Sequence, residues 1–335
     1  MTLPNAIFVD TNIFERQHFN FDGPVLSSLA QACKAHGIPL LLPDPILREL
    51  IRHVRVRAKE AHELVSKGRR TAPFLDTLRP STTPVEELTS YNATAETALK
   101  SYFARFSTVD LGYDGLDLNE LMNWYDTQSP PFGSGGKRKE FPDAFAIAIV
   151  ERFARERGIY VAVVSDDKGL KAACDRYTNL SHFMELSVLV ELLLDDENLV
   201  TAYKKIIEND PTELESQVAA AAAELPFLHL DRDYSISWSK VLAARMLSIR
   251  VVALSHGECT VTFVADVDAE HTLEWREDDT PEGDIECSAD VIEPSSIAGL
   301  AKVQIDLQGR RVTSVVMVEV DKSIRRVTET PSRYL

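Results

Sequence analysis

The sequence predicts two domains: an α/β domain over residues 1–195, and a smaller antiparallel β-rich domain over residues 230–335. In the first part, short apolar runs alternate with helical segments, which is typical of a parallel sheet flanked by helices. In the second part, apolar and polar residues alternate one by one, which is typical of half-buried antiparallel strands. Residues 196–229 include an alanine-rich run and are expected to form a helical connector. A chain of 335 residues is long enough for two such domains.

Three short apolar runs in the first domain are expected to be buried strands. They are residues 6–10, residues 38–42 and residues 160–164. Apart from Asp10 at the end of the first run, each is continuously apolar rather than alternating, as expected for strands covered on both faces. The hairpin expected in the second domain has its turn at Gln308 and Gly309, between two alternating runs.

The helices of the first domain have clear start and stop signals. One runs from Pro24 to about Ala35 and is closed by Gly37. A second is long, is capped by Asp44 and carries its apolar residues at helical spacing. A third begins near Pro142, ends at Gly158 and has its proline in the first turn. Residues 84–106 and 115–125 are expected to add two further helices.

Composition excludes several classes of protein. No apolar run reaches the roughly 18–20 residues that span a bilayer, and the first residues lack the pattern of a signal peptide. The four cysteines are far apart and form no CxxC pair: Cys33, Cys174, Cys259 and Cys287. We therefore expect neither a disulfide framework nor structural zinc, no membrane association, and a cytoplasmic location.

Charge is unevenly distributed along the chain. The net charge is −16, which alone argues against a general nucleic-acid binder. Residues 254–295, however, hold thirteen acidic residues against Arg276 alone, whereas residues 43–70 hold eight basic and four acidic residues. The acidity therefore belongs mainly to the second domain and says little about what the first domain binds.

Acidic residues follow two of the predicted strands. Asp10 ends the first strand, and the adjacent Asp166 and Asp167 follow the strand at residues 160–164. Ligands collect at the carboxyl ends of strands in open parallel sheets, so these acids are candidate metal ligands. The alternative for each is simple capping of the next helix.

Two further acids lie on helices. Glu49 sits between the apolar positions Leu47 and Leu50, near the buried edge of its helix, where a carboxylate needs a partner. That partner is either a metal, or Arg52 or His53 on the same helix. Asp143 lies near the start of an apolar helix and is either a ligand or a favourable charge at the helix N-terminus. As a set, the acids suit hard cations such as Mg²⁺ or Mn²⁺.

These segments together resemble the PIN-domain nucleases. FVDTN, PDPILREL, PDAFAIAIV and VVSDDKGL occur in the order and rough spacing of that family, over about residues 5–195. The segment GGKRKEFPDAF resembles a subgroup with a long insertion before the third acidic motif. The resemblance implies a parallel sheet with helices on both faces, and metal-dependent endonuclease cleavage of phosphodiester bonds, most often in RNA rather than DNA.

By position, the resemblance assigns roles to individual residues. Asp10, Glu49 and Asp143 match the first three acids, and Asn12 matches the polar residue that steadies the first. Ser165 and Asp167 match the hydroxyl and the acid of the last motif, although Asp166 could be the ligand instead. The cofactor implied is Mg²⁺ or Mn²⁺.

Basic residues near these acids are candidate substrate contacts. Arg48 and Arg52 lie on one face of the Glu49 helix, and Lys137, Arg138 and Lys139 precede Asp143 in a glycine-rich loop. Such side chains would neutralise phosphates flanking a cleavage site. The alternative for the helix face is an ordinary solvated surface. Trp124 and Tyr125 could stack a base, but core packing is the simpler expectation.

Two other functions compete with the nuclease. A phosphatase of the haloacid-dehalogenase kind also places an aspartate after its first strand, but needs a second two residues later, where this chain has Asn12. A catalytically inactive PIN-like scaffold that binds nucleic acid or a protein is the other alternative. Clustered like charges argue against it, because they repel one another without a metal.

The acidic second domain is expected to contact protein rather than nucleic acid. One version is an oligomerisation or partner-docking module with a solubilising surface. The other is autoinhibition, in which acids near residues 277–284 occupy the basic loop at residues 137–139.

Overall fold

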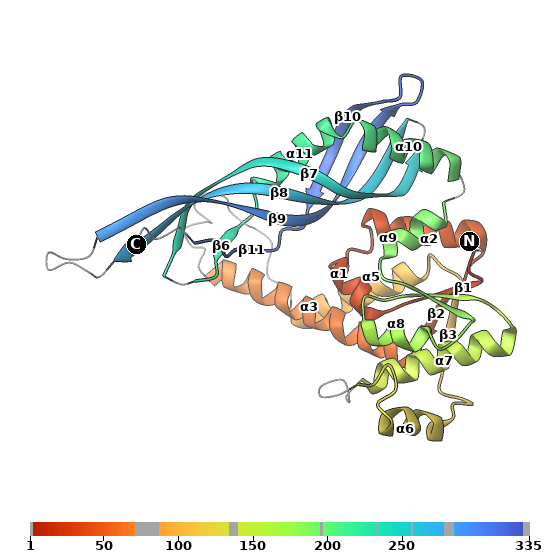
Figure 1. Ribbon diagram of the computed structural model, residues 1–335. Helices are drawn as coiled ribbons and strands as arrows, with labels where there is room; N and C mark the ends of the chain where they lie inside the picture. The colour runs from red at the N-terminus through yellow and green to blue at the C-terminus, as the bar shows by residue number, and fades with distance from the viewer. Residues whose placement is uncertain are drawn as a thin grey trace. The chain divides into compact units, whose positions relative to one another are not determined.

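The structure is a computed structural model that describes residues 3–70, 87–133, 140–194, 197–231, 233–255, 257–277 and 285–330. Its contacts divide the chain into two compact units, Met1–Leu193 and Leu194–Leu335. Figure 1 labels the helices and strands of both units.

A parallel sheet forms the centre of the first unit, as predicted, and the structure gives it five strands. Its strands are β1 (Ala6–Val9), β2 (Leu40–Pro43), β3 (Thr108–Leu111), β4 (Val161–Val164) and β5 (Leu180–Phe183). Their order in the sheet is β3-β2-β1-β4-β5. The three predicted strands are β1, β2 and β4, and all their residues are buried. The prediction omitted β3 and β5, which lie at the two edges and include polar residues.

The strand order creates a switch point beside β1. From β1 the chain proceeds to β2 and β3 on one side, and it later returns to add β4 and β5 on the other. Ile7 of β1 therefore pairs with Leu40 of β2 and with Ala162 of β4. Connections that leave a sheet in opposite directions open a crevice at the carboxyl ends of the strands. Asp10 and Ser165 directly follow β1 and β4, so the topology brings both to this edge.

Helices surround this sheet (Figure 1). They are α1 (Thr11–Arg16), α2 (Pro24–His36), α3 (Asp44–Arg70), α5 (Leu88–Phe103), α6 (Leu118–Asp126), α7 (Phe141–Arg157), α8 (Lys168–Cys174) and α9 (Leu186–Leu192). Gly37 and Gly158 end α2 and α7 in the left-handed conformation, with φ of 64° and 61°, as the sequence predicts. Across the described parts of the chain, no helix is both long and apolar enough to cross a membrane.

The second unit combines two helices with antiparallel strands, and the predicted β-rich class is confirmed. Its elements are α10 (Glu197–Asn209), α11 (Thr212–Ala222), β6 (Phe227–His229), β7 (Ser235–Ser255), β8 (Glu258–Glu277), β9 (Ile285–Asp306), β10 (Arg311–Val320) and β11 (Arg325–Val327). The main sheet has the order β10-β9-β8-β7, and β6 pairs with β11. The hairpin predicted at Gln308 and Gly309 joins β9 to β10, with Arg311 opposite Asp306.

Residue alternation along β8 explains how this sheet forms a core. From Cys259 to Leu273 every second residue is buried. The part of this face from Cys259 to Val267 packs with residues of α10 and α11, including Tyr203, Leu214 and Val218. The helices in the segment interpreted as a connector thus belong to the core of the second unit.

Part of the acidity of the second unit is neutralised across its strands. Arg245 lies 3.5 Å from Asp266, and Lys302 lies 2.7 Å from Glu258. Such exposed pairs contribute little stability, on the order of 0–1 kcal/mol each, but they reduce the charge of the sheet face. The predicted autoinhibitory contact involves residues 137–139 and 277–284, and all of these except residue 277 lie outside the described residues.

The cysteines provide a simple test of this fold. Cys33, Cys174 and Cys259 are buried, and burial raises the pKa of each thiol to about 12, whereas Cys287 is half-buried. Thiolate is the reactive form, so Cys287 alone should react quickly with a thiol reagent in the native protein. All four should react in denaturant. Mass spectrometry after brief labelling checks this, and rapid native labelling of Cys33 would contradict the packing of α2.

Candidate active site

Asp10 is a buried carboxylate at the carboxyl end of β1. Only 6% of the residue is exposed. Its Oδ1 accepts a hydrogen bond from the backbone N–H of Thr11 at 2.7 Å, which caps α1, and its Oδ2 accepts one from the Ser165 hydroxyl at 2.7 Å. Burial raises its pKa to about 6, against the opposing effect of these hydrogen bonds; the charges of Glu49 and Asp167 raise it further.

Ser165 connects the loops that follow β1 and β4. Its hydroxyl donates to Asp10 and accepts from the Asn12 side-chain amide at 3.1 Å and from the Asp167 backbone N–H at 3.0 Å. One hydrogen and two lone pairs are thereby all used. The hydroxyl fixes the side chains of Asp10 and Asn12 relative to each other.

Asp143 lies in the first turn of α7 and carries the second strongly shifted carboxyl group. Its pKa is raised to about 7, first by burial and then by the charges of Asp10, Glu49, Glu140 and Asp167. Carboxylates affect one another in this way only when they lie near each other in poorly solvated surroundings. The predicted acids of the other three segments, Asp10, Glu49 and Asp167, therefore all lie close enough to Asp143 to raise its pKa.

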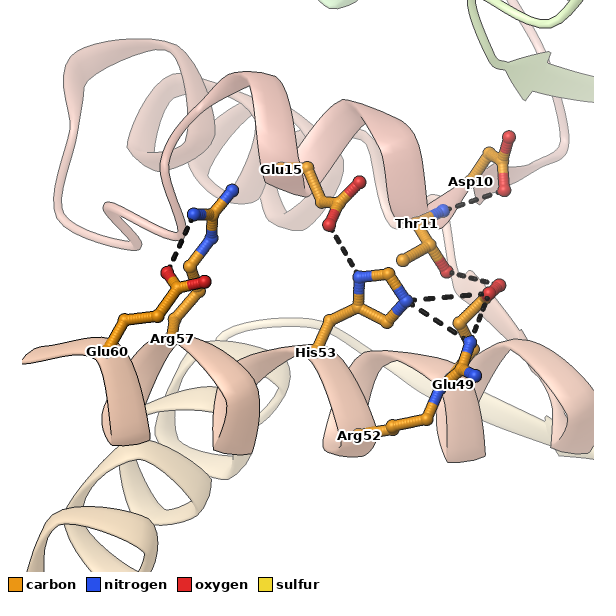
Figure 2. A network of polar contacts seen from close by, with 8 residues as sticks. All are labelled: Asp10, Thr11, Glu15, Glu49, Arg52, His53, Arg57 and Glu60. Atoms are coloured by element: carbon orange, nitrogen blue, oxygen red, sulfur yellow. Dashed lines mark hydrogen bonds and ion pairs between the residues drawn. The ribbon is translucent and has the colours of Figure 1, made fainter.

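Glu49 projects from α3 toward the same edge (Figure 2). Its Oε2 accepts a hydrogen bond from the Thr11 hydroxyl at 3.2 Å, and its Oε1 accepts one from Arg52 Nη2 at 3.0 Å. Thr11 thus links two of the acids, through its backbone N–H to Asp10 and through its side chain to Glu49. Arg52 and His53, the two partners that the sequence suggests for Glu49, therefore both lie near it. His53 Nε2 is 3.6 Å from Glu49 Oε1.

The adjacent Asp166 and Asp167 face different partners. Asp167 Oδ1 caps α8 by accepting from the Leu170 backbone N–H at 2.8 Å, and its charge raises the pKa values of Asp10 and Asp143. Asp166 pairs with Arg16 at 3.1 Å. Of the two, it is Asp167 whose charge affects the pKa values of the other acids.

The chemistry of this donor set suits a hard divalent cation. The side chains are carboxylates, and Asn12 adds a buried Oδ1 that accepts no hydrogen bond from the described residues. Oxygen atoms of these kinds are the ligands of Mg²⁺ and Mn²⁺. As they stand, no group of three or more His, Cys, Asp or Glu side chains within the described ranges has an arrangement that could hold a metal ion. Glu49 and Asp166 instead pair with arginines.

The candidate substrate contacts fall into three groups. Arg48 is exposed and pairs with Asp44 at 2.6 Å, and Arg52 lies beside Glu49. Lys137, Arg138 and Lys139 lie outside the described residues.

The two aromatic residues considered for base stacking pack within the protein. Trp124 is 5% exposed and lies under the Arg176 guanidinium, 4.7 Å from it. The ring of Tyr125 stacks on that of Phe141. Both therefore follow the simpler expectation of core packing.

Four residues near the acids were not identified from the sequence. Thr11 and Glu140 adjoin recognised motifs, so the signal was their position beside Asp10 and ahead of Asp143. Glu15 and Arg16 lie on α1 and contact His53 and Asp166. These contacts join residues 38 and 150 positions apart, and no local pattern in a single sequence indicates them.

Comparison with known proteins supports one family. Residues 7–170 match a family model described as PIN domain. No curated protein and no solved structure matches the chain. The matched span begins in β1 and ends in α8, and so includes all the acids described above. PIN domains are typically nucleases and generally bind divalent metals. Residues 7–170 of this chain, which lie in the first unit, are a PIN domain.

Proposed function

We propose that the first unit is a metal-dependent endonuclease that hydrolyses phosphodiester bonds, with RNA favoured over DNA. The observation that carries the proposal is electrostatic: the charge of Asp167 raises the pKa of both Asp10 and Asp143, and the charge of Asp10 raises that of Asp143. Four separate segments contribute acids to this set when Glu49 is included. The PIN domain match supports the reaction type, and the preference for RNA is what the resemblance to PIN-domain nucleases implies.

Asp10, Asp143 and Asp167 are the residues proposed to hold Mg²⁺ or Mn²⁺, and Glu49 completes the set directly or through water. A bound ion of this kind lowers the pKa of a water molecule and offsets negative charge at phosphorus. Ser165 and the Thr11 backbone hold both oxygens of Asp10, which keeps its carboxylate in one orientation. A fixed orientation before binding lowers the cost of assembling the site.

A cluster of acids must still admit a polyanion. Two exposed arginines lie beside the acids. Arg16 contacts Asp166 with its side chain 58% exposed, and Arg52 contacts Glu49 with its side chain 68% exposed. Guanidinium groups at these places can exchange a carboxylate partner for a phosphate once the acids are neutralised. From the sequence alone, Lys137, Arg138 and Lys139 are proposed to neutralise phosphates of the substrate.

A non-catalytic PIN scaffold remains the competing function. In that case the acids would bring only a cost, because burial and mutual repulsion disfavour their charged forms. The raised pKa values of Asp10 and Asp143 are a measure of that cost. Sites that tolerate it are commonly functional.

The purified full chain should cleave labelled RNA in Mn²⁺ or Mg²⁺ and should be inactive in EDTA. DNA of the same sequence should be cut more slowly. Cleavage should weaken as salt rises, because phosphate contacts release counterions. Binding of RNA without cleavage in either metal would favour the scaffold, and EDTA-resistant cleavage would contradict the proposed chemistry.

A further inference from the structure

A polar chain runs from α1 through His53 to Glu49 (Figure 2). We propose that His53, oriented by Glu15, is a positioning residue that holds the Glu49 carboxylate in the acidic site. The inference rests on the proposed nuclease function and adds two residues, Glu15 and His53, to the set that shapes the site.

Glu15 fixes the orientation of the His53 ring. His53 Nδ1 lies 2.5 Å from Glu15 Oε1, and the two side chains come from α3 and α1. An ionised carboxylate can only accept a hydrogen bond, so Nδ1 carries the hydrogen. In the neutral ring, Nε2 is then an acceptor that points away from Glu15.

The far side of the ring meets Arg52 and Glu49. His53 Nε2 lies 3.3 Å from Arg52 Nη2, and the same Nη2 is 3.0 Å from Glu49 Oε1. The Arg52 guanidinium is therefore shared between an acceptor nitrogen of the ring and a carboxylate oxygen. Because Arg52 is 68% exposed but His53 only 28%, the ring is the better anchored of the two partners.

The other oxygen of Glu49 is held from the opposite side. Thr11 donates its hydroxyl to Glu49 Oε2 at 3.2 Å, while its backbone N–H holds Asp10. Glu49 is thus held between Thr11 and the His53–Arg52 pair, with both oxygens engaged. Without His53, Arg52 would lose its contact with the ring nitrogen Nε2. The Arg52 guanidinium and the Glu49 carboxylate that it contacts would then be free to rotate together.

This arrangement orients a ligand rather than stabilising the fold. The contacts of Glu15, His53 and Arg52 are partly exposed, and such pairs contribute little to stability. Residues that orient metal ligands, in contrast, typically alter metal affinity by roughly 10–100-fold when replaced. The effect of removing His53 should therefore appear in metal binding, with little change in melting temperature.

Calorimetric titration of the full chain with Mn²⁺ tests the proposal. His53→Ala and Glu15→Ala, which removes the acceptor of the Nδ1 hydrogen bond, should each weaken Mn²⁺ binding about ten-fold. Glu60→Gln is the matched control, since Glu60 forms an exposed ion pair with Arg57 on the same helix at 2.9 Å. That variant should bind Mn²⁺ as the wild type does. The Glu15 side chain is partly exposed, so Glu15→Ala gives the same test if His53→Ala does not fold.

Two further variants separate the possible failures. In a Glu49→Gln background, His53→Ala should change Mn²⁺ affinity less than about two-fold, because its effect acts through Glu49. A further ten-fold loss in that background would overturn the positioning role, as would wild-type affinity in His53→Ala when Asp10→Asn abolishes binding. Unchanged Mn²⁺ binding and cleavage in Asp10→Asn would instead refute the proposed function itself.

Discussion

Asp10→Asn should lower the rate of RNA cleavage by at least about a hundred-fold, because it removes a charge from the centre of the proposed metal site. The side chain keeps its shape, and one oxygen can still accept from the Thr11 backbone N–H. Ser165 must adjust, since both lone pairs of its hydroxyl are already used by Asn12 and Asp167. Removal of a buried charge offsets that loss, so we expect the protein to remain folded.

Steady-state cleavage and Mn²⁺ titration of the same sample measure the effect. Asp114→Asn is the matched control, because Asp114 is an exposed carboxylate on the loop before α6. The control should cleave RNA at the wild-type rate. Near-normal activity of Asp10→Asn, with a normal melting curve, would remove Asp10 from the site.

The alternative roles considered for these acids are not exclusive. Asp10 and Asp167 both cap helices, as the simpler interpretation expected, and both lie among the interacting acids. A cap fixes a carboxylate through a backbone N–H, and the order of the strands decides that two such caps meet at one edge. Sequence pattern could therefore predict the place of these residues, although it left their role open.

Sequence pattern could not predict the edge strands or the contacts between residues far apart in the chain. β3 and β5 are four residues each and include polar residues, so they lack the continuous apolar run that marks β1 and β4. The link from Glu15 to His53 spans 38 residues and depends on how α1 packs near α3. Likewise, pairing of Arg245 with Asp266 depends on the register of β7 with β8, which the count of acidic residues does not contain.

Asp143→Asn should stabilise the metal-free protein while it abolishes cleavage. Burial, together with the charges of nearby acids, raises the pKa of Asp143 from 3.8 to about 7 in the folded state. The protonated form is therefore favoured by folding. Its stabilising contribution is complete below about pH 4 and is lost as pH rises toward 7.

The difference in melting temperature between Asp143→Asn and wild type should therefore be small near pH 4 and largest above pH 7. Each kcal/mol of relief corresponds to roughly 2–4 °C for a unit of this size. Mn²⁺ at pH 8 should raise the melting temperature of wild type more than that of the variant, because ligand binding stabilises only the state that binds. Asp114→Asn should show neither effect, as its carboxylate is exposed.

If the melting temperature of Asp143→Asn follows that of wild type at every pH, Asp143 is not repelled by the neighbouring acids. We therefore expect Asp143→Asn to melt above wild type at high pH without metal, and this difference to shrink or reverse when Mn²⁺ is added. A cation site should behave in this way, because the negative charges that repel one another in the metal-free protein are the charges that attract the metal.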